Sequence, residues 1–176
     1  TPSPSPSGSP IPISGNNIIL NPTFQNGLES WDHSRKATLT LETGEGPDGG
    51  NAVKVSRTAA DGNIGQYGKK LKQGATYQVI LTAKRETGAG TRPIRVMINQ
   101  SGVQYIGTNY PPMLNFTNIG EEWTTVTGTF VYDKAKHTAG TEYDDAYIYM
   151  QFDVNAGAGF DDKGTTPFYV AELSIY

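Results

Sequence analysis

A short segment near the end of the chain carries the residues best suited to binding chemistry. Residues 144–152 read Asp-Asp-Ala-Tyr-Ile-Tyr-Met-Gln-Phe, in which apolar and polar side chains alternate. Side chains on a β-strand point to opposite faces in turn, so Tyr147, Tyr149 and Gln151 should share one face. A flat tyrosine ring with a hydroxyl at its edge suits a sugar, which has an apolar C–H face and a rim of hydroxyls. Tyrosine also favours strands in general, so an ordinary strand is the alternative.

A second alternating segment, residues 91–99, offers another polar face. Its isoleucines and valine at alternate positions should point inward, which leaves Arg95, Met97 and Asn99 pointing outward. A turn at residues 100–102 leads into a further strand that contains Tyr105. A three-residue loop would place Tyr105 beside Met97, and a two-residue loop would place it in the core, because a slip of one residue reverses the face. Both placements stay open.

The length and composition of the chain exclude several classes of site and partner. A chain of 176 residues is long enough for one domain with a sizeable core. It has no cysteine, which excludes disulfides and cysteine-based metal sites or nucleophiles. The formal net charge of −3, with acids and bases interspersed, argues against a nucleic-acid partner. Because no apolar run is long enough to span a bilayer, we expect no membrane partner either.

The chain divides into a linker and one folded module. Residues 1–14 alternate proline with serine or other small residues, a composition that cannot bury enough apolar surface to fold. We therefore expect an interdomain linker at residues 1–15 and a folded module at residues 16–176. No signal-peptide pattern opens the sequence, so we expect it to begin partway through a larger protein. Roughly nine or ten short strands separated by Gly-rich turns, the first at residues 17–24 and another at residues 103–108, predict an all-β, two-sheet antiparallel β-sandwich.

Four segments stand out in order along this module. They read Asn-Pro-Thr-Phe-Gln-Asn-Gly-Leu-Glu-Ser-Trp at 21–31, Leu-x-x-Gly-x-x-Tyr at 71–77, Trp-x-x-Val-x-Gly-x-Phe at 123–130 and Phe-Tyr-Val-Ala-Glu-Leu at 168–173. Together they resemble the jelly-roll carbohydrate-binding modules of families four, nine, sixteen and twenty-two. Arg57-Thr58 lacks the tryptophan that often follows this pair in family twenty-two, so the resemblance does not single out one family.

The resemblance implies a jelly roll whose concave sheet forms a groove for one polysaccharide chain, such as xylan, a β-glucan, a cellulose chain or a mannan. It places Tyr147, Tyr149 and Gln151 in that groove, with Arg95 and Asn99 on a neighbouring strand. Tyr105 joins them if its turn has three residues. The resemblance also implies a secreted, monomeric module that is covalently linked to a catalytic domain, a glycoside hydrolase. It further implies that Trp31 and Trp123 pack in the core or between the sheets.

These modules usually hold a structural Ca²⁺ on the side opposite the groove. Calcium takes six to eight oxygen ligands from carboxylates, amides and carbonyls. The family's first ligand, a glutamate after the phenylalanine, corresponds to Gln25 here, and its last, an aspartate in the closing strand, to Glu172. The loop at residues 45–51 could add Glu45 and Asp48. The resemblance thus implies a calcium site with less negative charge than usual.

Two other functions compete with carbohydrate binding. A glycosidase needs two carboxylates across the scissile bond, whereas no Asp or Glu lies on the predicted polar face of the Tyr147 strand. The two histidines, His33 and His137, have no metal-ligand spacing, so we expect no enzymatic activity. A structural or protein-docking sandwich fits the fold equally well, because function depends on the site and not on the fold.

Overall fold

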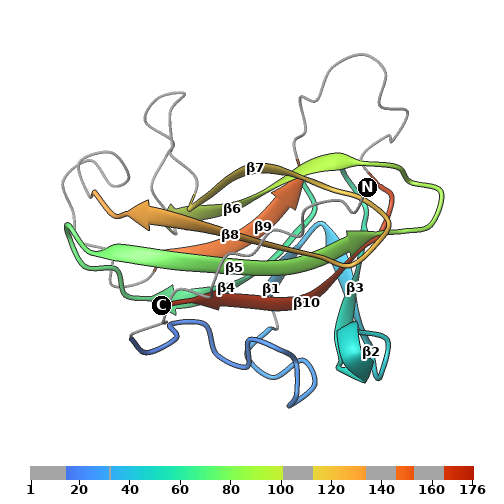
Figure 1. The fold of residues 1–176 in the computed structure, drawn as a ribbon, viewed down its shortest axis with the longest axis horizontal. Helices are drawn as coiled ribbons and strands as arrows, with labels where there is room; N and C mark the ends of the chain where they lie inside the picture. The colour runs from blue at the N-terminus through green and yellow to red at the C-terminus, as the bar shows by residue number, and fades with distance from the viewer. Residues whose placement is uncertain (1–14, 32, 101–112, 134–145, 153–164) are drawn as a thin grey trace, which may run out of the picture.

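The computed structural model describes residues 15–31, 33–100, 113–133, 146–152 and 165–176. Their regular structure consists of β-strands and one short 3-10 turn, η1 (Pro47–Gly49) (Figure 1). The strands are β1 (His33–Arg35), β2 (Ala37–Glu42), β3 (Ala52–Arg57), β4 (Asn63–Lys69), β5 (Thr76–Arg85), β6 (Arg92–Gln100), β7 (Leu114–Ile119), β8 (Thr124–Val131), β9 (Ala146–Phe152) and β10 (Phe168–Ile175). Among these residues, no helix is long and apolar enough to cross a membrane.

The strands form two antiparallel sheets. The β9 sheet has the order β1-β4-β9-β6-β7, and the β10 sheet has the order β2-β3-β10-β5-β8 (Figure 1). One core joins them: Ile148 and Met150 of β9 and Val79 and Leu81 of β5 are fully buried in the same cluster. This confirms the predicted all-β, two-sheet antiparallel β-sandwich. It also means that the other face of β9, which carries Tyr147, points away from the shared core.

The N-terminal segment differs from the sequence-based expectation. We predicted a first strand at residues 17–24, but the structure has bends and turns there. Asn21 and Phe24 adopt positive φ angles of 46° and 58°, and Pro22 has no backbone N–H, so a regular ladder cannot form. The segment instead packs along the last strand, where the Leu173 N–H donates to the Pro22 carbonyl at 3.0 Å.

A second difference concerns the strands before β8. The strand predicted at residues 103–108 lies outside the described residues. β7 was not predicted, yet it pairs with β6 along the edge of the β9 sheet. Its sequence, Leu-Asn-Phe-Thr-Asn-Ile, contains two asparagines, which are depleted in strands.

A β-bulge in β10 shapes the outer face of the β10 sheet. The register of β10 against β5 shifts between Val170 and Glu172. Val170 and Leu173 are both in the core, so the two residues between them, Ala171 and Glu172, both face outward. This doubling brings the Glu172 side chain to the outer surface beside the N-terminal segment.

Candidate functional site

The strand register brings the predicted binding residues onto one face. β9 pairs with β6 so that Tyr147 lies opposite Asn99, Tyr149 opposite Met97, and Gln151 opposite Arg95. The backbone positions of all five predicted residues on these strands therefore belong to the face of the β9 sheet that points away from the core. The side chains of Asn99 and Gln151, and all of Tyr105, lie outside what the structure describes.

Three tyrosines form a stack on this outer face. The Tyr147 and Tyr149 rings are stacked with centroids 5.0 Å apart, and Tyr67 of β4 stacks on Tyr147 at 4.2 Å. The two predicted tyrosines are buried, with exposed fractions of 6% and 5%, whereas Tyr67 is 40% exposed. Of these three rings, that of Tyr67 is the most exposed, and the ring of Tyr147 lies between those of Tyr67 and Tyr149. We expected Tyr147 and Tyr149 themselves to stack on the ligand, and that role stays a prediction: the structure shows both rings stacked on the predicted face and largely buried.

A bulge in β4 aims Tyr67 at Tyr147. The register of β4 against β9 shifts between Gln66 and Lys69, which leaves Tyr67 and Gly68 opposite a single residue. Gly68 has a φ of 71°, in the left-handed region that glycine adopts readily. The dipeptide Tyr67-Gly68 inside a strand was the available sequence signal, because glycine in a strand often marks a bulge.

Gly65 lets the Tyr147 ring lie along the sheet. Gly65 is paired with Tyr149, and a Cβ added to it would lie 2.8 Å from Cε2 of Tyr147. Passing over this glycine, the Tyr147 hydroxyl reaches Asn63 and donates a buried hydrogen bond of 2.7 Å to Asn63 Oδ1. The ring is therefore fixed at both ends, by the strand and by Asn63.

The hydroxyl of Tyr147 has a raised pKa, and Arg35 is the charged residue that opposes the shift. Burial raises the pKa of the Tyr147 hydroxyl far above its ordinary value, a neighbouring Tyr67 adds to this, and the charge of Arg35 opposes it. The hydroxyl thus stays protonated and keeps its donor role at all ordinary pH values. Arg35 is exposed and is paired with Asn63, so it lies at the β1 edge of the same face.

Replacing Gly65 with alanine is expected to destabilise the module by about 2–3 kcal/mol, as overpacking does in a tight site. The new Cβ would lie 2.2 Å from the Ile148 carbonyl oxygen and 2.7 Å from Tyr149 Cβ, so the strands must separate. Urea unfolding would measure the change. Gly120→Ala is the matched control, because its Cβ would meet the Thr91 hydroxyl at 3.4 Å, and equal stabilities for the two variants would contradict this account.

The two tryptophans lie in different surroundings. Trp31 is fully buried, packs against Phe24 with centroids 4.9 Å apart, and donates its indole N–H to the Asn21 carbonyl at 2.8 Å. Its predicted packing role is confirmed. Trp123 is half-buried on the outer face of the β10 sheet, where the Lys84 ammonium lies 5.0 Å from its ring centre, so its predicted core role is wrong.

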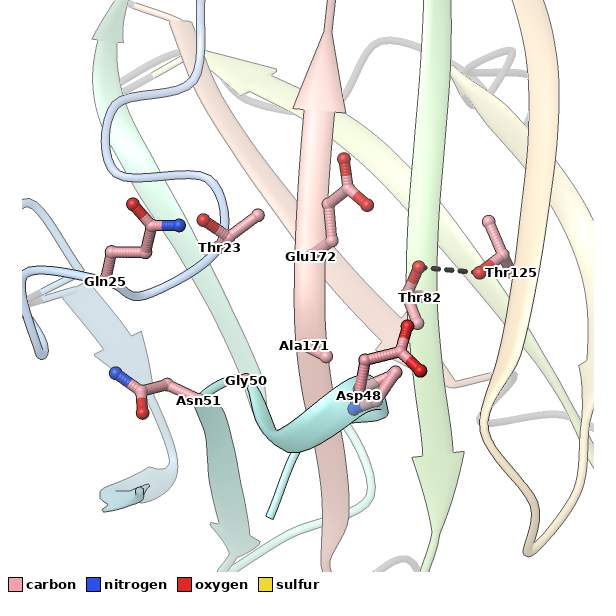
Figure 2. Close-up of a pocket in the computed structure, with 10 residues that line it drawn as sticks. Thr23, Gln25, Asp48, Gly50, Asn51, Thr82, Thr125, Ala171 and Glu172 are labelled. Atoms are coloured by element: carbon pink, nitrogen blue, oxygen red, sulfur yellow. Dashed lines mark hydrogen bonds between the residues drawn. The ribbon is translucent and has the colours of Figure 1, made fainter. Parts of the chain in front are cut away.

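A pocket of about 530 Å³ lies on the outer face of the β10 sheet, away from the tyrosine stack. Figure 2 shows it enclosed by the N-terminal segment on one side, the loop that contains η1 below, and strands β10, β5 and β8. Its lining residues are Thr23, Gln25, Pro47, Asp48, Gly50, Asn51, Thr82, Thr125, Ala171 and Glu172. Three of the four predicted calcium ligands, Gln25, Asp48 and Glu172, are among them, and Glu45 is not.

The pocket lining combines oxygen atoms from two carboxylates, two amides and three threonine hydroxyls with the apolar side chains of Pro47 and Ala171. Asp48 sits in η1 with a φ of 54°, held in a loop that Gly50 closes by donating its N–H to the Pro47 carbonyl at 3.0 Å. The Asn51 side-chain N–H donates to the Phe24 carbonyl at 2.9 Å, which leaves the amide oxygen as a free acceptor. The described residues contain no group of three or more His, Cys, Asp or Glu suited to a metal.

These donors suit a hard cation. Two carboxylates, from Asp48 and Glu172, together with amide oxygens are the ligand types that Ca²⁺ prefers. Glu172 Oε1 accepts a hydrogen bond of 2.7 Å from Ser174 Oγ, which orients the carboxylate and leaves its second oxygen available. Because nitrogen and sulfur ligands are missing from this lining, the pocket does not fit zinc or another soft metal.

Solved structures share the fold. The CBM22-1 xylan-binding domain from Paenibacillus barcinonensis Xyn10C superposes with a TM-score of 0.65 at 12% identity, covering 92% of this chain and 94% of that domain. The C-terminal family 22 carbohydrate binding module of Clostridium thermocellum Xyn10B gives 0.62 at 19% identity, covering 93% and 96%.

A known sequence and a family description also match. Endo-1,4-beta-xylanase A of Thermoanaerobacterium saccharolyticum is 24% identical over 168 residues, which are 93% of this chain but 13% of that enzyme. The carbohydrate binding domain family that unites modules of families four and nine matches residues 16–143. That range contains β1 to β8 and the opening segment that first suggested the resemblance. The chain belongs to this family of carbohydrate-binding domains.

Proposed function

We propose that this chain is a secreted, non-catalytic module that binds a plant or microbial polysaccharide along the outer face of the β9 sheet. Its ligand is of the xylan, β-glucan or mannan type, with xylan first, and its role is to hold an attached glycoside hydrolase at its substrate. The observation that carries the proposal is the stack of Tyr67, Tyr147 and Tyr149. These aromatic rings lie outside the shared core and end in one exposed ring, and a tyrosine ring with a hydroxyl at its edge suits the face of a sugar.

In this proposal each residue has a defined task. A pyranose ring stacks on the exposed face of Tyr67, whose other face is covered by Tyr147. Arg35 and Arg95 flank the stack and donate hydrogen bonds to the hydroxyl rim of the sugar. A face of this kind is open and wet, so we expect a dissociation constant of about micromolar order. Tethering raises the local concentration of the attached enzyme at its substrate.

The relatives and the face itself support a non-catalytic role. The structural neighbours include xylan-binding domains, and the sequence relative is a xylanase of which this chain matches a small part. The described strands of the β9 sheet carry no Asp or Glu, the residue types that a glycosidase uses as a pair. Reducing-sugar release by the isolated module would contradict this role.

Affinity gel electrophoresis against xylan, barley β-glucan, glucomannan and laminarin tests the proposal. Retardation by one polysaccharide class, and by xylan first, is the expected result. If no polysaccharide retards the module, with or without calcium, then the polysaccharide proposal is wrong. The competing role, a structural or protein-interaction sandwich, would then be favoured.

We also propose that the pocket on the β10 sheet binds Ca²⁺ through Asp48, Glu172, Gln25 and Asn51. A cation there would tie the N-terminal segment and the η1 loop to β10 and so stabilise the fold. At about 100 times its dissociation constant, calcium should add about 2.7 kcal/mol, or about 5–10 °C in the unfolding midpoint. Differential scanning fluorimetry in calcium and in EDTA measures this shift.

Gln25→Glu sharpens the calcium test. It adds a third carboxylate to the pocket lining, so the calcium-dependent shift should increase and appear at lower calcium concentration. Glu45→Gln, outside the lining, is the matched control and should leave the shift unchanged. Identical midpoints in calcium and EDTA for both the unchanged chain and Gln25→Glu would rule the site out.

A further inference from the structure

The β9 sheet carries an unusual charge distribution. The chain as a whole has 17 acidic and 14 basic residues, a formal net charge of −3. In contrast, the five strands of the β9 sheet contain Arg35, Lys69, Arg92 and Arg95 but no Asp or Glu. A sheet that is basic within an acidic protein suggests a ligand of opposite charge.

The register sorts these cations between the two faces. Arg92 and Lys69 lie on the core-facing side of their strands. Arg92 is two residues before the buried Ile94, and Lys69 is paired with the buried Ala146. Both are buried, with exposed fractions of 4% and 6%. Two arginines therefore remain on the outer face with the tyrosine stack: Arg35 and Arg95.

These two arginines occupy the ends of one row. Arg35 is paired with Asn63 across β1 and β4, and Arg95 is paired with Gln151 across β6 and β9. Since Ile64 is paired with Met150, the preceding Asn63 lies opposite Gln151, and the row runs continuously from β1 to β6. With neighbouring strands about 4.8 Å apart, the arginine backbones are about 14 Å apart.

Arg35 is the better placed of the two to meet a ligand. It is exposed, and it is paired across the strands with Asn63, the residue that accepts the hydrogen bond from the Tyr147 hydroxyl. The acid that also senses Arg35 is Asp61, whose pKa is lowered first by its hydrogen bond with Lys36. Lys36 Nζ lies 2.7 Å from Asp61 Oδ2, so this carboxylate already has a cation of its own.

We propose that the outer face of the β9 sheet selects an acidic polysaccharide, a xylan-type chain bearing uronate substituents, whose carboxylates are bound by Arg35 and Arg95. This rests on the proposed function, because the tyrosine stack must still bind the sugar backbone. A guanidinium presents a planar fork of N–H donors that matches a carboxylate, and such charge-assisted hydrogen bonds are stronger than those to neutral hydroxyls. Arg35 binds the carboxylate of the uronate nearest Tyr67. Arg95 binds the carboxylate of a second uronate, at the β6 end of the row.

Isothermal titration calorimetry with two matched polymers tests the proposal. The first is glucuronoxylan, and the second is the same polymer after chemical reduction of its carboxylates to alcohols. The unchanged module should bind the native polymer at least about tenfold more tightly. That preference should shrink as NaCl is raised, whereas affinity for the reduced polymer should not change.

Variants assign the preference to the arginines. Arg35→Gln should bring the two polymers to nearly equal affinity, because it removes the charge at an exposed position without disturbing the stack. Lys70→Gln removes an exposed charge just beyond β4 and should keep the full preference. Arg95→Gln should lower the preference in part, and its unfolding midpoint shows whether this half-buried variant stays folded.

The outcomes separate this inference from the proposed function. Equal affinity of the unchanged module for native and reduced polymer overturns the acidic selectivity and leaves polysaccharide binding intact. A preference that survives in Arg35→Gln assigns the selectivity to other groups and overturns the role given to Arg35. Failure to bind either polymer overturns the proposed function together with this inference.

Discussion

Replacing Tyr67 with alanine is expected to lower the affinity for the polysaccharide by about 10- to 100-fold, the size of a single aromatic anchor in an interface. Tyr67 is the exposed end of the tyrosine stack, at 40% exposure, and Tyr147 already covers its other face at 4.2 Å. Removing the ring would remove the exposed platform and leave only the face of Tyr147, whose ring centre lies 4.2 Å from that of Tyr67. Calorimetry with xylan would measure the loss.

Two controls make this result specific. Tyr67→Phe keeps the ring and loses the hydroxyl, so it should retain most of the affinity if stacking dominates. Val131→Ala removes an apolar side chain that is 59% exposed on β8 of the opposite sheet, and it should change nothing. The substitution at Tyr67 should leave the unfolding midpoint nearly unchanged. Unaltered affinity in Tyr67→Ala would show that the ligand binds elsewhere.

The location of the proposed binding face followed from the sequence because alternation is a local property. In β9 and β6 every second residue is apolar. If these residues face the core, an unbroken strand must place the residues between them on the opposite face. The structure accordingly places Tyr147, Tyr149 and Arg95 on the face that the sequence indicated. Their pairing followed from the resemblance to known modules, since alternation alone does not say which strands are neighbours.

The residue that carries the platform could not be predicted in the same way. Tyr67 continues the outward alternation of Gly65, but the inward positions on either side of it hold the polar residues Gln66 and Lys69, so the sequence of this strand shows no apolar face. The burial of Tyr147 and Tyr149 is also a tertiary property, because it comes from neighbours on other strands. Sequence patterns give the face of a residue but not how deeply other side chains cover it.

For the proposed calcium site, the resemblance to known modules was more informative than the sequence pattern. Neither composition nor alternation indicated it, whereas the resemblance pointed to Gln25 and Glu172, and the structure brings both into one pocket. Glu45 and Asp48 were chosen from one loop with equal justification, yet η1 turns Asp48 into the pocket and leaves Glu45 outside it. A loop's composition supplies candidate ligands, and its backbone conformation decides among them.

Replacing Tyr147 with alanine is expected to produce the larger overall effect, because this side chain serves the fold and the platform together. Its ring is 94% buried between Tyr67 and Tyr149, so its loss should cost about 3–5 kcal/mol of stability, as for other buried aromatic residues. Tyr67 would also lose the surface against which it is held. Affinity should therefore fall even at temperatures where the variant remains folded, and urea unfolding with calorimetry measures both losses.

Tyr147→Phe separates support from direct contact. The phenylalanine ring preserves the stack but removes the hydroxyl that donates to Asn63 Oδ1, so stability should fall by about 1–2 kcal/mol. Because Asn63 is buried and the ring at position 147 still packs against Tyr67, affinity should stay within about twofold of the unchanged module. A hydroxyl that bound sugar directly would instead cost affinity on removal. Intact binding in Tyr147→Phe together with lost binding in Tyr147→Ala would therefore establish that this buried tyrosine acts by positioning the exposed one.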